Sequence, residues 1–260
     1  LVAPTELGMS PSIIARNEST NDAAREAQGI LNDRIVSQSD RIATQDEAPV
    51  VNQSQGLMSR PELEPKVTIT ADNTLNIDVL YKGLSDSQKD NVDSLLNSLD
   101  NNGISGVEKV AFIAQAKRES GNFNTLVESG GSAGDAYFVK KYWANESVRN
   151  NLGNESKQDA IDFKGRGPLQ LTGKWNYQHV NKLLKEVGID VDIVKNPDLL
   201  ETNKEIGDLT SILYWKDRVV KRKGITDFTD VDKVTSGINP GEDRETKDIR
   251  KGFFKELYKG

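Results

Sequence analysis

The chain has 260 residues, of which 35% are apolar, enough for a hydrophobic core in part of it. It contains no Cys and one His, which excludes thiol nucleophiles, disulfides and thiolate zinc sites and disfavours a Ser-His triad or a multi-His zinc site. A net charge of −6 argues against a general nucleic-acid binder, whereas 40 Asp and Glu leave carboxylate chemistry open. No apolar run reaches the roughly 20 residues that span a membrane.

Residues 1–64 differ in composition from the rest of the chain. They are rich in Ser, Asn, Gln, Asp and Pro, and all 16 aromatic residues follow them, beginning with Tyr81. Such a segment cannot by itself bury enough surface to offset its conformational entropy. A helical spacing of apolar residues follows Ser19, a possible N-cap. Two interpretations remain open: a disordered linker, or an extended and partly helical arm that orders on a partner. Because the first residue is Leu1, we also expect a processed product.

Residues 65–84 are predicted to form a β-hairpin connector. Val67 to Thr70 and Leu75 to Leu80 both alternate apolar and polar residues, and a turn-forming Ala-Asp-Asn-Thr cluster separates them. Alternation around such a turn is typical of two antiparallel strands.

From residue 85 onward the apolar spacing predicts helices. Ser85 and Asp86 cap the first, which ends before Gly103. A second begins near Ser105 and is apolar nearly all round, as expected of a buried helix. Glu119 lies in its last turn, where a carboxylate is held rigidly and is partly removed from water. This placement suits a general acid.

A connection of about forty residues follows. It holds several glycines, then the aromatics Tyr137, Phe138, Tyr142 and Trp143, then a polar run. Long connections inside a domain usually line a binding site or form a lid. The aromatics either stack on a ligand or pack in the core, and we favour the core.

The segment GRGPLQLTG begins at Gly165. Its glycines permit a close backbone approach, and Pro168 constrains the turn. Leucines alternate with Gln170 and Thr172, so one face packs while the other presents an amide and a hydroxyl. Further helices are expected at 175–187, at 203–220 and at the C-terminal IRKGFFKELY. Apart from the hairpin, the domain is predicted to be α-helical.

Two glutamates of this region make a candidate acid and base pair. Glu128 follows Glu119 by nine residues. Inverting hydrolysis of a glycosidic bond needs two carboxyl groups separated by roughly 6.5 to 9.5 Å, so that a water molecule fits between them. A helix-end glutamate and a loop carboxylate can reach that spacing. Asp135 and Glu146 are the rival candidates for the base.

Residues 85–258 resemble glycoside hydrolase family 19, the chitinase family that also includes lysozyme-like endolysins of phages and bacteria. The resemblance lies in the order of the motifs AQ-x-x-x-ESG-x-F, GRGPLQLTG-x-x-NY, NPDLL, VT-x-x-INPG and IRKGFFKELY. It implies a mainly α fold, a lysozyme-like two-lobed catalytic domain at residues 85–260. The hairpin and the extended N-terminal arm would precede this domain.

The resemblance also implies roles for individual residues. Glu119 matches the acid, Glu128 the carboxylate that orients the attacking water, and Thr172 the hydroxyl that helps hold this water. The implied substrate-binding set is Gln170, Asn176, Tyr177, Asn239 and Arg250. Within this set, Arg250 supports the acid electrostatically, with Glu242 as its partner. The resemblance implies no metal and no cofactor.

The expected substrate follows from the branch of the family. The longer cysteine-bearing loops of plant chitinases are absent, which favours the lysozyme-like branch, although Arg118 stands where endolysins often have His. We therefore expect an enzyme that cuts a β-1,4 bond of peptidoglycan glycan strands at the bacterial cell wall, in the periplasm or outside the cell. The arm would tether it to a virion, tail or secretion protein. The alternatives are a chitinase, a lytic transglycosylase and a catalytically silent wall-binding or structural module.

Overall fold

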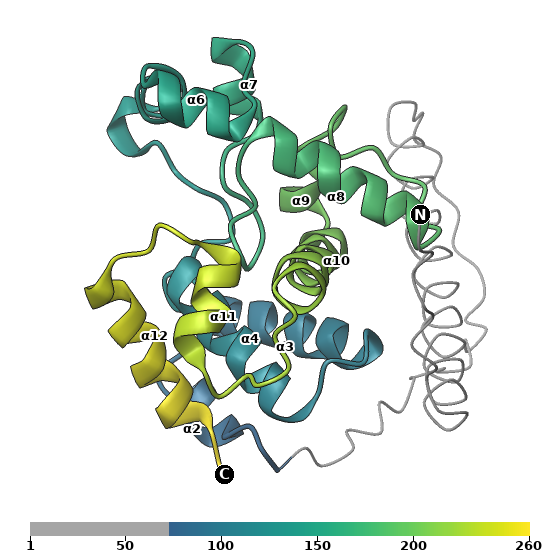
Figure 1. Ribbon diagram of the computed structural model, residues 1–260, viewed down its shortest axis with the longest axis vertical. Helices are drawn as coiled ribbons and strands as arrows, with labels where there is room; N and C mark the ends of the chain where they lie inside the picture. The colour runs from purple at the N-terminus through teal and green to yellow at the C-terminus, as the bar shows by residue number, and fades with distance from the viewer. Residues whose placement is uncertain (1–72) are drawn as a thin grey trace, which may run out of the picture.

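The computed structural model describes residues 73–260, which are mostly helical, as predicted (Figure 1). The proposed arm at 1–64 and the first predicted hairpin strand lie outside the described residues. The elements are α2 (Ile77–Tyr81), α3 (Asp86–Asn101), α4 (Gly106–Glu119), the 3-10 turn η1 (Gly131–Ala133), α5 (Asp135–Phe138), the π-helix η2 (Val139–Trp143), α6 (Glu146–Leu152), α7 (Lys157–Asp162), α8 (Lys174–Glu186), α9 (Leu199–Thr202), α10 (Lys204–Trp215), the π-helix η3 (Lys216–Arg222), α11 (Val231–Ile238) and α12 (Arg244–Leu257).

Local signals place the first long helices where they were predicted. The side chain of Ser85 accepts a hydrogen bond from the backbone of Gln88, whose own side chain accepts one from the Ser85 backbone at 2.9 Å. This capping box satisfies two backbone donors that have no partner inside the helix. α4 is buried along most of its length and ends at Glu119, also as predicted.

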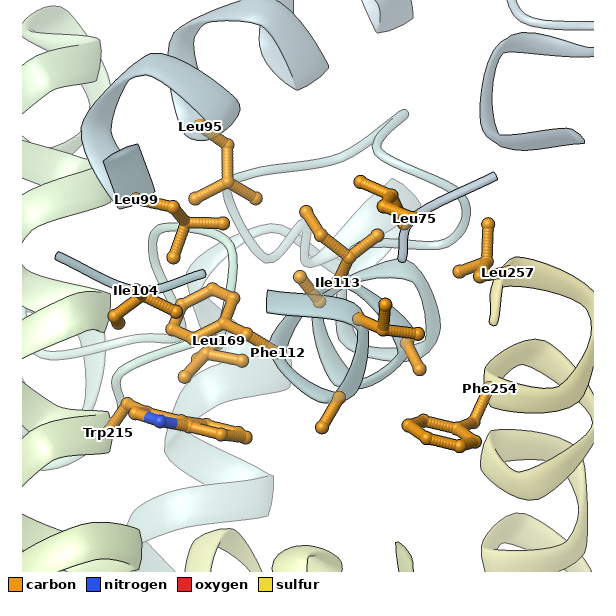
Figure 2. Close-up of a cluster of buried hydrophobic side chains, with 14 of the residues drawn as sticks. Leu75, Leu95, Leu99, Ile104, Phe112, Ile113, Leu169, Trp215, Phe254 and Leu257 are labelled. Atoms are coloured by element: carbon orange, nitrogen blue, oxygen red, sulfur yellow. The ribbon is translucent and has the colours of Figure 1, made fainter. Parts of the chain in front are cut away.

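The largest hydrophobic core surrounds α4 (Figure 2). α3 contributes Leu95 and Leu99, α10 contributes Trp215, and α12 contributes Phe254 and Leu257. Phe112 of α4 packs on the Trp215 ring, with 5.0 Å between ring centroids. Since α4 is enclosed on several sides, its last residue has a fixed position.

A second core gathers α8, α9 and α10, which gives the two lobes that were predicted. α10 belongs to both cores, since Ile212 and Trp215 pack in the first while Ile206 and Leu209 pack in the second. In Figure 1, α10 lies between α8 and the group formed by α3 and α4. Within residues 73–260, no helix combines the length and the apolar character needed to cross a bilayer.

The predicted second strand of the hairpin, Leu75 to Leu80, is wrong. Leu75 makes an isolated bridge with Tyr258, and the backbone N–H of Asn76 donates to Leu257 at 2.7 Å. The chain then turns into α2, in which Ile77 is exposed and Leu80 is buried. A short alternating run does not distinguish a strand from a helical turn, and docking on the end of α12 decides between them here.

The long connection after Glu128 is mostly helical rather than an open loop. Asn145 caps α6 and Ser156 caps α7 through their side chains. Phe138 and Tyr142 form a small core with Ala160, which supports the core interpretation of these aromatics. Elements α6 and α7 lie together at the end of the molecule far from α12 (Figure 1).

Candidate active site

Glu119 is held at the end of α4 by an arginine from the last helix. Nη2 of Arg250 lies 2.6 Å from Glu119 Oε1, and the same nitrogen pairs with Glu242. Nη1 of Arg250 donates to Gln115 Oε1 at 2.8 Å. Arg250 is 1% exposed, whereas the Glu119 side chain is 23% exposed. Arg250 therefore holds Glu119 from the protein interior, and solvent reaches the glutamate rather than the arginine.

Asn239 joins this cluster from the exposed end of α11. Its Nδ2 lies 3.3 Å from Glu242 Oε2. Asn239 is exposed and Glu242 is partly buried. Of the predicted binding residues, Asn239 thus contacts Glu242, the second partner of Arg250, and is open to solvent.

Glu128 is surrounded by hydrogen-bond donors. Its Oε1 accepts from Lys141 Nζ at 2.7 Å and from the Tyr137 hydroxyl at 3.3 Å. Its Oε2 accepts from the Tyr142 hydroxyl at 2.7 Å and from the Gly165 N–H at 3.2 Å. Burial by itself raises the pKa of Glu128, but the hydrogen bonds of Lys141 and Tyr142 and the charge of Lys141 outweigh it and lower this pKa below its usual value. The carboxylate is therefore kept ionised.

Three residues of the predicted site, Glu128, Gln170 and Thr172, lie around Gly165 of the GRGPLQLTG segment. The Glu128 N–H donates to the Gly165 carbonyl at 2.8 Å, so the two segments are joined by their backbones. A methyl carbon placed on Gly165 would lie 2.8 Å from Gln170 Oε1 and 3.2 Å from both Glu128 Oε2 and Thr172 Oγ1. Because both lie 3.2 Å from the same point, Glu128 Oε2 and Thr172 Oγ1 are separated by at most twice 3.2 Å. One water molecule can contact both.

Unusual backbone conformations accompany both site segments. Gln170 has a φ of 51°, and Asn122 and Phe123, in the loop after Glu119, have φ of 63° and 62°. Non-glycine residues rarely adopt this left-handed region, and such residues cluster at functional sites. The Thr172 hydroxyl donates to the Gln170 carbonyl at 2.8 Å, which fixes the turn. These conformations were not predictable from the residue types.

Contacts through α8, α10 and η3 connect the two halves of the site. Asn176 Nδ2 donates to the Thr172 carbonyl at 2.8 Å, and Arg218 Nη2 donates to Asn176 Oδ1 at 3.1 Å. The neighbouring Tyr214 has a raised pKa because it is buried, and the negative charge of Glu119 contributes to the increase. Thr172 is therefore linked through Asn176 to Arg218, whose guanidinium lies 5.4 Å from the ring of Tyr214, the residue on which the charge of Glu119 acts.

Tyr177, predicted to bind substrate, is buried in the core, which argues against a direct contact with substrate. Its side chain is 0% exposed, and burial raises its pKa to about 12. The hydroxyl donates to the Lys164 carbonyl at 3.0 Å and accepts from Arg166 Nη1 at 3.1 Å. Neighbouring residues on a helix point roughly 100° apart. Asn176 consequently faces the site while Tyr177 supports the GRGPLQLTG segment from the core.

The two rivals of Glu128 lie at exposed positions. Asp135 is exposed, and the Glu146 side chain is 78% exposed beside Arg149.

Sequence reasoning missed Lys141 and the hydroxyl of Tyr142 as partners of Glu128. The four-residue spacing of Tyr137 and Lys141 was the available signal for the lysine, since it places the two on one face of a helical turn, whereas Tyr142 lies off that face in a regular α-helix. Across residues 73–260 there is no group of three or more His, Asp or Glu that could hold a metal ion.

Comparison with known proteins identifies the family of the chain. The sequence profile of glycoside hydrolase family 19, described as chitinase class I, matches residues 96–244, which is more than half of the chain. A family 19 domain-containing protein of Haemophilus influenzae is 29% identical over 158 residues, which cover 53% of this chain and 73% of that protein. An acidic endochitinase of Petunia hybrida is 32% identical over 108 residues, which cover 42% of this chain and 35% of the petunia protein.

Among solved structures, chitinase C of Streptomyces griseus HUT6037 matches with a TM-score of 0.47 at 17% identity. The match covers 68% of this chain and 71% of that chain.

Proposed function

The chain belongs to glycoside hydrolase family 19, and from this premise we propose that residues 85–260 hydrolyse a β-1,4 bond in the glycan strands of peptidoglycan. One observation carries the proposal: Glu128, Gln170 and Thr172 converge on Gly165. Glu119 is oriented by its ion pair with Arg250, and its charge acts on Tyr214, whose ring lies under Arg218, the partner of Asn176. Two carboxylates and a hydroxyl so arranged suit hydrolysis with direct attack by water.

Glu119 is the proposed general acid. It donates a proton to the departing glycosidic oxygen and is left as a carboxylate. Arg250, at 2.6 Å, fixes the orientation of the group before transfer and stabilises the charge formed after it. Glu242 shares Arg250 and so limits how strongly the arginine holds the acid.

Glu128 is the proposed general base. Its lowered pKa keeps it ionised near neutral pH, so it accepts a proton from the attacking water. The Thr172 hydroxyl donates its hydrogen to the Gln170 carbonyl, which leaves the Thr172 oxygen able to accept a hydrogen bond from that water. The water attacks the anomeric carbon on the face opposite the leaving group, which inverts its configuration.

Zymography on purified peptidoglycan tests the assignment. Glu119→Gln and Glu128→Gln are compared with the parent and with Glu146→Gln, a matched control at an exposed position. Each site variant should lose about 3 kcal/mol or more of transition-state stabilisation, a rate decrease of roughly 100-fold. Clearing by Glu119→Gln equal to that of the parent would remove Glu119 from the mechanism. No clearing by any of the proteins would favour a catalytically silent binding or structural module.

Chitin is the second candidate substrate, because relatives of this chain carry the description endochitinase. Reducing-end release from chitin oligosaccharides and from peptidoglycan is measured in parallel. We expect faster turnover of peptidoglycan, and the opposite order would identify a chitinase. Mass spectrometry of the products separates a third class, since anhydro-muramyl ends would indicate a lytic transglycosylase and contradict attack by water.

Residues 1–64 are proposed to tether the enzyme to a virion, tail or secretion protein, so that it acts at the bacterial wall in the periplasm or outside the cell. Their polar, aromatic-free composition supports this proposal. A protein lacking residues 1–64 should still degrade purified walls at the parental rate. Loss of that activity would contradict the tether.

A further inference from the structure

The carboxylate of Glu128 receives three of its four hydrogen bonds from one short helical segment. Tyr137 belongs to α5, and Lys141 and Tyr142 belong to the π-helix η2 that continues it. The fourth donor is the backbone N–H of Gly165. We propose that Lys141 and Tyr142 are positioning residues, which hold Glu128 at the angle needed to direct the attacking water. This inference rests on the proposed function.

The π-helical geometry of η2 explains how one segment supplies these donors. In an α-helix, residues five apart point about 140° away from each other. The Ala144 N–H bonds instead to the Val139 carbonyl, five residues back, which widens the turn. Tyr137 and Tyr142 can then both direct their hydroxyls to Glu128. Such π turns recur at functional sites because they re-aim side chains.

Tyr142 is the rigid member of the pair. It is buried and stacks on Phe138 with 14° between the ring planes. Its backbone carbonyl accepts from Asn154 Nδ2 at 3.2 Å. A hydroxyl carried by a ring fixed in this way gives Glu128 Oε2 one orientation.

Lys141 is the charged member of the pair. Its side chain is 45% exposed, and its ammonium group lies over the rings of Tyr137 and Tyr142 at 5.3 and 4.9 Å. The groups that face Glu128 are thus one cation, two phenols and the Gly165 N–H. Because Lys141 adds little to the core, its removal should alter Glu128 without unfolding the protein.

The pH profile distinguishes positioning from a structural role. A general base acts only when ionised, so activity falls as pH drops through its pKa. Burial raises the pKa of Glu128, and the hydrogen bonds from Lys141 and Tyr142 lower it. Without the Lys141 charge this pKa rises, and the acidic limb of the kcat profile moves to higher pH. A purely structural contact would leave the limb unchanged.

The experiment compares Lys141→Gln, Lys141→Arg and Tyr142→Phe with the parent. Lys140→Gln is the matched control, since it removes the same charge from the exposed neighbouring position. We expect Lys141→Gln to lower kcat by about tenfold, less than the roughly 100-fold or greater loss on removing a base, with little change in KM. The acidic limb of the kcat profile of Lys141→Gln should move to higher pH. Lys141→Arg should restore the parental limb, and Lys140→Gln should match the parent.

Glu128→Gln separates failure of this inference from failure of the proposed function. If Glu128→Gln is inactive while Lys141→Gln and Tyr142→Phe keep the parental kcat and acidic limb, the positioning role is wrong and the hydrolase proposal stands. If Glu128→Gln keeps full activity, the proposed function itself is wrong. If circular dichroism shows that Lys141→Gln does not fold, kcat and the acidic limb of Tyr142→Phe decide the question. This variant keeps the ring that stacks on Phe138, so it should fold.

Discussion

A methyl group at Gly165 tests the proposed site at its centre. The backbone of Gly165 does not have a positive φ, so Gly165→Ala introduces no backbone strain. The new carbon would lie 2.8 Å from Gln170 Oε1 and 3.2 Å from both Glu128 Oε2 and Thr172 Oγ1. All three contacts are tighter than ordinary carbon–oxygen packing, so these side chains must move apart, and an apolar group enters the space that they border.

The expected cost in activity is much larger than the cost in stability. Moving the amide end of Gln170 is inexpensive, and crowding of this kind costs about 1–3 kcal/mol, partly offset by about 0.4–1 kcal/mol from the less flexible unfolded chain. Loss of the water contact of the base removes a contribution of roughly 10² to 10⁴ in rate, or about 3 to 5 kcal/mol. Gly165→Ala should therefore fold and be nearly inactive.

The assay is reducing-end release from the substrate that the parent cuts best, with thermal unfolding measured on the same samples. Gly252→Ala is the control, since Gly252 is exposed inside α12 and a methyl there would have no neighbour within 4 Å. It should gain about 0.5–1 kcal/mol in stability and keep full activity. A folded Gly165→Ala with parental turnover would refute the reasoning, because the space beside Glu128 and Thr172 would then be irrelevant to catalysis.

Three further predictions concern buried groups. Arg250→Ala leaves Glu119 and Glu242 without their shared cation, so the free energy of unfolding measured with urea should fall by about 3–5 kcal/mol, and an unchanged value would contradict the ion-pair network. Burial raises the pKa of Asp208 to about 7, so the folded state holds a proton that the unfolded chain releases above about pH 4. Parental stability should thus decline between pH 4 and 7 by up to about 4 kcal/mol, and Asp208→Asn should abolish this decline; parallel curves for the two proteins would disprove the assignment. Tyr177→Phe should lose about 1–3 kcal/mol of stability with KM unchanged, whereas a raised KM without loss of stability would return Tyr177 to the substrate site.

Features that depend on residues close together in the chain were determined by the sequence alone. The capping box at Ser85 and the central apolar run of α4 are set within a few residues, so their bounds followed from spacing. The order of the motifs likewise predicted Glu119, Glu128 and Thr172 as a catalytic set, which is the set proposed above. The short run from Leu75 to Leu80 was predicted wrongly, because its conformation depends on docking to α12.

The tertiary structure alone decided which side chains meet. Arg250 reaches Glu119 across 131 residues of sequence, and its burial makes it a support rather than a ligand contact. Packing of α8 against the core turned Tyr177 inward and left Asn176 beside Thr172. The π turn of η2 brought Lys141 to Glu128. Each of these outcomes depends on the relative placement of elements that pack through nonlocal contacts, and no local pattern encodes that placement.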